Sequence, residues 1–271
     1  LRSQTLLVHP VSDLPNVKDE KIALRVVVIS DTHSKHEKIK NPLPEGDVII
    51  HCGDLTNVGT LGETTKAIEW FGALTQYKCR IMVAGNHDLT IDDKTYESVT
   101  KPRFHRWYAK NPKKVPADVK KAKKEYLALM KKLDIVYLED ESFSFQNINF
   151  YGSPQSPTFN DWGFNQDRGE QIKKYWEKIP PNTDILITHG PPLGHGDWCV
   201  SPGCAAIGQK PANPLDRGGT RAGCVDLLKK VQQIRPRFHL FGHIHEAYGI
   251  TTDGYTSFLN ASTCTFRYQP T

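Results

Sequence analysis

The sequence has no apolar run that approaches the ~20 residues a membrane-spanning helix needs. Residues 1–20 also lack the apolar stretch of a secretory signal peptide, and we expect them to lie across the surface as an extended arm. There is no internal repeat and no low-complexity tract, so nothing indicates a repeat protein. These absences favour a globular protein of the cytoplasm that does not bind a membrane.

Closely spaced cysteines are absent as well. The six cysteines stand at positions 52, 79, 199, 204, 224 and 264, with no spacing typical of a zinc ribbon or a disulfide framework. Cys199 and Cys204 could pair, or bind metal, in their Gly/Pro-rich loop, although we favour two free thiols. A reducing cytoplasm fits this pattern, and we regard the glycosylation sequon at 260–262 as fortuitous.

The net charge is mild, at +5 for 271 residues, and the basic residues are concentrated between positions 101 and 124. Basic residues interleaved with aromatics can bind nucleic acid. The alternative is a loop followed by an amphipathic helix over 116–133, with an apolar face and a face of solvated lysines. We favour the helix and expect no nucleic-acid partner.

Polar side chains follow five short apolar runs that have the composition of buried strands. The runs end near residues 29, 52, 84, 188 and 241. In open α/β sheets, ligands gather beyond the carboxyl ends of the strands, so we expect these side chains to meet. They are Asp31, His33, Asp54, Asn86, His87, Asp88, His189, His243 and His245.

These side chains offer carboxylate, amide and imidazole donors, which suit manganese, iron, zinc or nickel better than calcium. His243 and His245 are two residues apart, so an extended backbone would direct both to the same side. Seven of these nine side chains, all except His87 and Asp88, are candidate metal ligands, and seven are too many for one tetrahedral ion. The set favours two ions that share a carboxylate, as in two-metal phosphoesterases, whose ions lie roughly 3.5–4 Å apart.

The ordered motifs resemble those of the calcineurin-like metallophosphoesterases over nearly the whole chain. They are Asp31-x-His33, Gly53-Asp54, Gly85-Asn86-His87-Asp88, His189 and Gly242-His243-x-His245. Stretches at 31–34, 188–194, 253–256 and 260–265 are similar to the metallophosphoesterase-domain-containing (MPPED) subgroup. Some members of this subgroup have glycine where this chain has His243, so the intact set implies two metal sites and turnover.

The resemblance implies a role for each position. Manganese is the first candidate for the two divalent ions, with iron, zinc, nickel or cobalt as alternatives. One ion would be held by Asp31, His33 and His245, the other by Asn86, His189 and His243, and both by Asp54. Asn86 and His87 would face the phosphate; His87 would protonate the leaving oxygen, and Asp88 would orient His87.

The resemblance also implies hydrolysis of small phosphodiesters, with 3′,5′- or 2′,3′-cyclic nucleotides as candidate substrates. A hydroxide between the two ions would attack in line, with His87 as the general acid. One alternative is a phosphomonoesterase or protein phosphatase on the same site, which the lack of an arginine beside any metal motif disfavours. Another is a weakly active scaffold or binding protein, which the intact ligand set disfavours.

The fold that the resemblance implies is α/β, with four layers (αββα): two mixed β-sheets face to face and helices outside. Because the candidate ligands span residues 31 to 245, we predict one domain over 21–271. Apolar spacing predicts helices over 61–77, 116–133, 168–178 and 220–234. We also predict one strand over 143–151 and a hairpin around Asp253-Gly254.

Two loops, at 153–165 and 191–219, could shape a pocket for a small phosphodiester or nucleotide. Trp162, Phe164 and Trp198 could stack on a nucleobase there, although such aromatics often only attach a loop to the core. The sequence does not indicate an oligomeric state.

Overall fold

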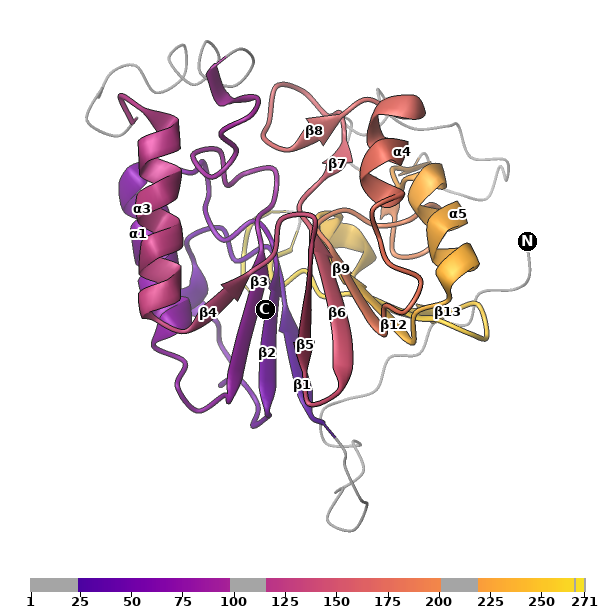
Figure 1. Cartoon of the computed structure of the whole chain (residues 1–271), viewed down its shortest axis with the longest axis horizontal. Coiled ribbons are helices and arrows are strands. Elements are labelled where there is room, and N and C mark those ends of the chain that lie inside the picture. Colours follow the sequence, from indigo (N-terminus) through magenta and orange to yellow (C-terminus); the bar gives the residue numbers. More distant parts are fainter. Residues whose placement is uncertain (1–23, 98–115, 201–218, 266, 271) are drawn as a thin grey trace.

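Figure 1 shows the computed structural model, which describes residues 24–97, 116–200, 219–265 and 267–270. The predicted N-terminal arm, most of the basic stretch and Cys204 lie outside these residues. Among the described residues, no helix has both the length and the apolar character needed to cross a bilayer.

The first sheet is parallel throughout, in the order β1-β2-β3-β4. Its strands are β1 (Val26–Ile29), β2 (Val48–Cys52), β3 (Cys79–Val83) and β4 (Ile135–Tyr137). Every residue of β2 and β3 is buried, as expected for parallel strands covered on both faces. Two mixed sheets were expected, but only the second of these two sheets combines parallel and antiparallel strands.

The second sheet has six strands in the order β13-β14-β12-β9-β6-β5. The four central strands are parallel, and hairpins add β13 and β5 antiparallel at the two edges. The strands are β5 (Glu141–Phe145), β6 (Ile148–Ser153), β9 (Ile185–Thr188), β12 (Phe238–Phe241), β13 (Gly249–Thr252) and β14 (Ser257–Asn260).

The hairpin predicted around Asp253-Gly254 is confirmed between β13 and β14. The single strand predicted over 143–151 is wrong, because the chain reverses between β5 and β6 at Gln146 and Asn147. These two residues have φ of 49° and 62°, and two successive left-handed residues form the turn that matches the twist of a hairpin. Glutamine is not typical of that conformation, so the sequence did not indicate the turn.

Helices cover the outer face of each sheet (Figure 1). On the first sheet lie α1 (Leu61–Gly72) and α3 (Val119–Lys132), and on the second lie α4 (Glu170–Trp176) and α5 (Val225–Ile234). Short elements near the loops are η2 (His36–Lys38), β7 (Ser156–Pro157), β8 (Asn165–Gln166), β10 (Trp198–Cys199), β11 (Thr220–Arg221) and η6 (His245–Ala247). The last predicted helix starts later than expected because β11 pairs with β10 before α5 begins.

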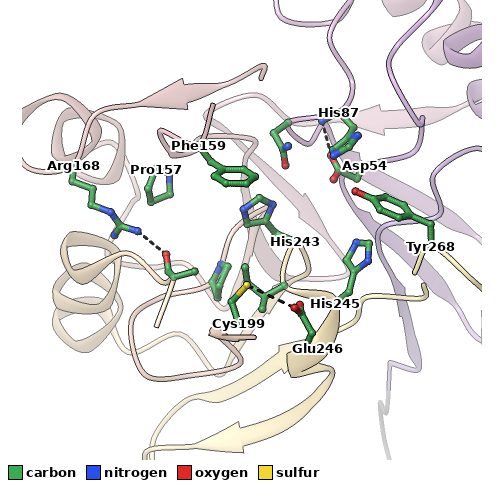
Figure 2. A pocket seen from close by; sticks show the side chains of 14 residues that line it. Asp54, His87, Pro157, Phe159, Arg168, Cys199, His243, His245, Glu246 and Tyr268 are labelled. Atoms are coloured by element: carbon green, nitrogen blue, oxygen red, sulfur yellow. Dashed lines mark hydrogen bonds between the residues drawn. The ribbon is translucent and has the colours of Figure 1, made fainter. Parts of the chain in front are cut away.

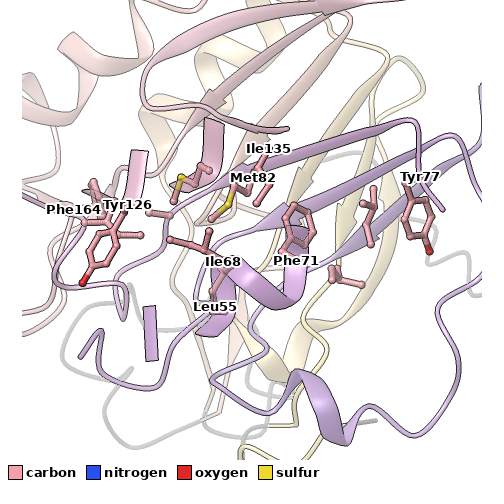
Figure 3. Close-up of a cluster of buried hydrophobic side chains, with 14 of the residues drawn as sticks. Leu55, Ile68, Phe71, Tyr77, Met82, Tyr126, Ile135 and Phe164 are labelled. Carbon is pink, nitrogen blue, oxygen red and sulfur yellow. The ribbon is translucent and has the colours of Figure 1, made fainter. Parts of the chain in front are cut away.

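Three apolar layers hold the secondary structure together. One lies between the first sheet and its helices, and Figure 3 shows its members Phe71, Met82 and Tyr126. A second lies between the two sheets and includes Ile50 and Phe150. The third packs α4 and α5 on the second sheet. This packing confirms the four-layer αββα arrangement.

The loops that follow β1, β2, β9 and β12 are joined by main-chain hydrogen bonds. The Asp31 N–H donates to the Gly53 carbonyl oxygen at 2.9 Å, and the Gly242 N–H donates to the His189 carbonyl oxygen at 3.0 Å. A β-bridge between Ser30 and Ser262 links the two sheets at the same edge. The carboxyl ends of strands from both sheets therefore meet there.

Candidate metal centre

All seven predicted ligands meet at this edge of the molecule. The carboxylates of Asp31 and Asp54 are buried, and their ionic contacts are with imidazoles. No lysine or arginine among the described residues pairs with either carboxylate. Buried charges need partners, and a cluster of carboxylates and imidazoles can supply the ligands of a divalent cation.

The first group consists of Asp31 and His33, in the loop after β1, and His245, which begins η6 after β12. The Nε2 atom of His33 lies 3.1 Å from the Nε2 atom of His245. The Nε2 atom of His245 lies 3.3 Å from Asp31 Oδ1. Ligand-capable atoms of all three residues lie within 4.8 Å of one another, so one cation could contact them all.

The second group consists of Asp54, His189 and His243, whose ligand-capable atoms also lie within 4.8 Å of one another. The Nε2 atom of His189 lies 2.8 Å from the Asn86 amide oxygen and 3.4 Å from Asp54 Oδ1. The other oxygen, Asp54 Oδ2, lies 3.7 Å from Nε2 of His33 in the first group. Asp54 thus directs one oxygen toward each group.

Main-chain carbonyls fix the orientation of three imidazoles. The Nδ1–H of His33 donates to the Thr56 carbonyl oxygen at 3.2 Å. The Nδ1–H of His189 donates to Cys52 at 2.9 Å, and that of His245 donates to Thr265 at 3.0 Å. A carbonyl only accepts, so in each neutral ring the hydrogen is on Nδ1 and the Nε2 lone pair faces the centre. Such outer hydrogen bonds orient metal-binding histidines. The residues therefore fit a metal ion in each group.

The surroundings divide the histidines into two kinds. Burial lowers the pKa of His33 and His243 to about 3, which keeps both rings neutral and available as ligands. Burial also opposes protonation of His189 and His245, but the neighbouring carboxylate charges outweigh it and raise the pKa of each ring to about 9. Protons and cations compete for these two rings, so metal binding should release protons.

The loops that carry the ligands contain strained backbone. Asp31, His33, Asp54 and His243 have φ of 55°, 44°, 56° and 69°, in the left-handed region that non-glycine residues rarely adopt. Each such residue costs about 1–3 kcal/mol and persists only where its surroundings fix it. Strain at four of the seven predicted ligands indicates a functional site.

Gly242 permits the close approach of β12 to the loop after β1. A Cβ atom at this position would lie 2.1 Å from Asp31 Oδ2 and 2.1 Å from Ser30 Oγ. Gly242→Ala should therefore displace Asp31 and weaken metal binding by at least ~10–100-fold, the usual cost of disturbing an outer contact of a metal site.

Elemental analysis of the purified variant would check this, with Gly62→Ala in α1 as the control. A Cβ atom at Gly62 would meet no heavy atom within 4 Å, so that variant should bind metal as the parent chain does. Equal metal content in the two variants would contradict the steric argument.

Asp88 does not orient His87, which corrects the predicted role. The buried Asp88 carboxylate accepts hydrogen bonds from the N–H groups of Leu55, Thr56 and Gly85 and from the Thr56 hydroxyl. Burial, followed by a neighbouring carboxylate charge, raises the pKa of Asp88 to about 6. Through these hydrogen bonds, Asp88 joins the loop after β2 to the loop after β3.

The main chain and an aromatic ring hold His87 instead. Its Nδ1–H donates to the Asn57 carbonyl oxygen at 2.6 Å, and its ring stacks on Trp162 with centroids 4.0 Å apart. A ring nitrogen of His87 lies within 4.8 Å of ligand-capable atoms of His33 and Asp54. The imidazole thus stands at the border of the metal groups in a fixed orientation.

A cavity of about 220 Å³ opens over the two groups (Figure 2). Asn86 and His87 line it, as predicted, and so do three residues that the sequence did not indicate: Phe159, Arg168 and Tyr268. Arg168 stands beside no metal motif in the sequence, yet it lines the cavity. Phe159 belongs to the predicted pocket loop and Arg168 follows it closely, but no local signal marks Tyr268.

The three aromatics considered as possible stacking partners of a nucleobase do not line the cavity. Phe164 is buried in the apolar layer below α3, and Trp162 packs on His87. Trp198 packs beneath Arg221, whose guanidinium carbon lies 5.6 Å from the ring centroid. These placements favour packing against the protein itself over stacking on a nucleobase.

Cys199 is disulfide-bonded, which corrects the preference for two free thiols. The four other described cysteines are free and buried: Cys52, Cys79, Cys224 and Cys264.

Residues 24–247 match a family model described as calcineurin-like phosphoesterase. The chain is 41% identical over 249 residues to Metallophosphoesterase domain-containing protein 1 of Homo sapiens, covering 91% of this chain and 68% of that protein. It is 36% identical over 243 residues to a UPF0046 protein of Caenorhabditis elegans, covering 89% of this chain and 75% of that protein.

Among solved structures, the chain has a weak likeness to a protein serine/threonine phosphatase from Saccharomyces cerevisiae. The two are 10% identical, with a TM-score of 0.37, and the match covers 91% of this chain and 70% of that one. A TM-score this low carries no weight for fold or function.

Proposed function

The chain belongs to the calcineurin-like phosphoesterase family, and on that premise we propose that it hydrolyses small phosphodiesters with two divalent metal ions. The proposal includes manganese as the ion, a 3′,5′- or 2′,3′-cyclic nucleotide as the substrate, and the cytoplasm as the place of action. One observation carries it: Asp54 turns one oxygen toward each of two imidazole groups.

The proposed ligands follow from this arrangement. They are Asp31, His33 and His245 for one ion, Asn86, His189 and His243 for the other, and Asp54 for both. When bound, two divalent ions supply positive charge against the phosphate and lower the pKa of a water molecule.

His87 would provide the proton that the leaving oxygen needs. Its Nδ1–H is held by the Asn57 carbonyl oxygen, so Nε2 is the atom that can deliver a proton toward the cavity. The stacked Trp162 keeps the ring from rotating. An imidazole N–H within reach of the leaving oxygen can serve as a general acid.

Arg168 favours a second candidate function, a phosphomonoesterase or protein phosphatase. A guanidinium at the edge of the cavity could bind the additional charge of a phosphomonoester. Its N–H groups, however, donate to the carbonyl oxygens of Ala222 and Gly223 at 2.6 and 2.7 Å. Because these bonds occupy two of the five guanidinium N–H donors and hold Arg168 against the main chain, we prefer the diester.

Turnover of bis-p-nitrophenyl phosphate and of p-nitrophenyl phosphate would test the proposal. We expect manganese-dependent hydrolysis with the higher kcat/KM for the diester, and no hydrolysis in the presence of a chelator. Preference for the monoester would support the second candidate. If the manganese-loaded chain hydrolysed neither compound, both would fail and a binding protein with this fold would be favoured.

A further inference from the structure

The segment that follows β14 crosses the loops of the metal centre. The Thr263 N–H donates to the Ser30 carbonyl oxygen at 2.8 Å, and the Ser262 hydroxyl donates to Asp31 Oδ2 at 2.9 Å. The Thr265 carbonyl oxygen accepts the Nδ1–H of His245. This segment therefore supports two predicted ligands before the chain turns back.

The turn that comes next presents Tyr268 to the site. The Tyr268 N–H donates to the Thr265 carbonyl oxygen at 2.8 Å, and the residue has a φ of 56°. The Lys35 ammonium donates to the Tyr268 carbonyl oxygen and lies 5.6 Å from its ring centroid. A left-handed conformation is unfavourable for a bulky residue, so these contacts hold Tyr268 in a position that it would not otherwise prefer.

The Tyr268 ring packs edge-on against imidazoles of the centre. Its centroid lies 4.6 Å from that of His33 and 5.3 Å from that of His245, with interplanar angles of 72° and 74°. The His87 centroid lies 6.1 Å away. Tyr268 is thus a wall of the cavity beside both the first ligand group and the proposed general acid.

The phenol oxygen is directed into the cavity. Figure 2 shows it pointing toward Asp54 and His87. Among the described residues, this oxygen has no hydrogen-bond partner: Tyr268 contacts its neighbours through its ring and its main chain. The Tyr268 hydroxyl is therefore available to donate a hydrogen bond to a phosphate bound in the cavity.

We propose that Tyr268 contacts the substrate, with its O–H donating a hydrogen bond to a non-bridging phosphoryl oxygen. This inference rests on the proposed function and deepens it. A phosphodiester has one negative charge, and a neutral phenol adds a hydrogen bond without the extra positive charge that would favour a monoester. The ring also excludes water from one side of the cavity, which strengthens such a bond.

Tyr268→Phe tests the contact because it removes the hydroxyl and keeps the ring. For the full manganese-loaded chain, we expect kcat/KM for bis-p-nitrophenyl phosphate to fall about 10–100-fold, the effect of losing one hydrogen bond to a charged group. Affinity for inorganic phosphate, measured by titration calorimetry, should fall in the same direction. Metal content and the thermal unfolding midpoint should not change.

Tyr255→Phe is the matched control, since this tyrosine is 63% exposed and does not line the cavity. It should leave kcat/KM and phosphate affinity at the parent values. Tyr268→Ala removes the ring as well and should reduce kcat/KM further.

Three results would overturn the inference. One is unchanged kcat/KM and phosphate affinity in Tyr268→Phe. Another is faster turnover in Tyr268→Ala, which would mean that the ring blocks the site. The third is loss of metal from Tyr268→Phe, which would indicate a structural role. If the parent chain turned over no phosphoester, the proposed function would fail, while phosphate affinity would still test Tyr268.

Discussion

Asp54→Asn is expected to remove metal from both ligand groups and to reduce turnover more than the ~10²–10⁴-fold that loss of a general acid produces. Asp54 Oδ1 lies 3.4 Å from His189 Nε2, and Oδ2 lies 3.7 Å from His33 Nε2. Asparagine has the same shape but no charge. Two cations held close together would then lack the negative charge that offsets their repulsion.

The main chain predicts which way the asparagine amide would point. The His87 N–H donates to Asp54 Oδ1 at 2.8 Å, so the amide oxygen would take that position. The amide nitrogen would then occupy the Oδ2 position, facing His33. An NH₂ group cannot coordinate a cation and would repel one, so the first ion should be lost most completely.

Metal content by elemental analysis and kcat on the diester substrate are the measurements. Asp47→Asn is the control, because Asp47 precedes β2 at the end away from the site and pairs with Lys78 at 2.8 Å. Loss of such a surface ion pair costs about 0–1 kcal/mol, and metal binding should persist. A full complement of metal in Asp54→Asn would exclude a shared carboxylate.

His87→Ala is expected to reduce turnover by ~10²–10⁴-fold for a substrate with an alkoxide leaving group, such as a cyclic nucleotide. The loss should be much smaller for bis-p-nitrophenyl phosphate, because p-nitrophenolate leaves without being protonated. This difference follows from the proposed role of His87 Nε2 as the proton donor, with Asn57 and Trp162 holding the ring in place.

Parallel assays of His87→Ala on the two leaving groups, with metal content measured on the same sample, would check this. Retained metal together with a selective loss on the alkoxide substrate identifies a general acid. Because a His87 nitrogen lies near His33 and Asp54, loss of metal would instead identify His87 as a ligand. An equal loss on both substrates would also argue against proton donation.

Much of the candidate site could be predicted because of a geometric property of parallel strands. Their carboxyl ends coincide, so polar residues that follow separate apolar runs must meet even when far apart in the sequence. Asp31, Asp54 and His189 follow β1, β2 and β9 within two residues, and the structure brings all three into adjoining ligand groups. The meeting of the ligands was accessible in this way, whereas the αββα layers were implied by the family resemblance and the C-terminal hairpin by the Asp253-Gly254 turn signal.

The remaining features depend on contacts that no local pattern contains. Asp88 follows His87 in the sequence, yet its side chain turns to the N–H groups of the loop after β2. Tyr268 reaches the site only because Lys35 and Thr265 fix a left-handed turn. Neither the direction of a side chain nor the path of a segment after the last strand can be read from apolar spacing.

The two ligand groups draw on both sheets: Asp31, His33 and Asp54 come from the first, and His189, His243 and His245 from the second. Ions bound by residues of both groups would cross-link the two sheets, which otherwise contact each other through the apolar layer between them. A ligand at a free concentration of 100 times its dissociation constant contributes about 2.7 kcal/mol to the free energy of unfolding. Metal supply would then govern how often the sheets separate, and with it the resistance of the enzyme to heat and proteolysis.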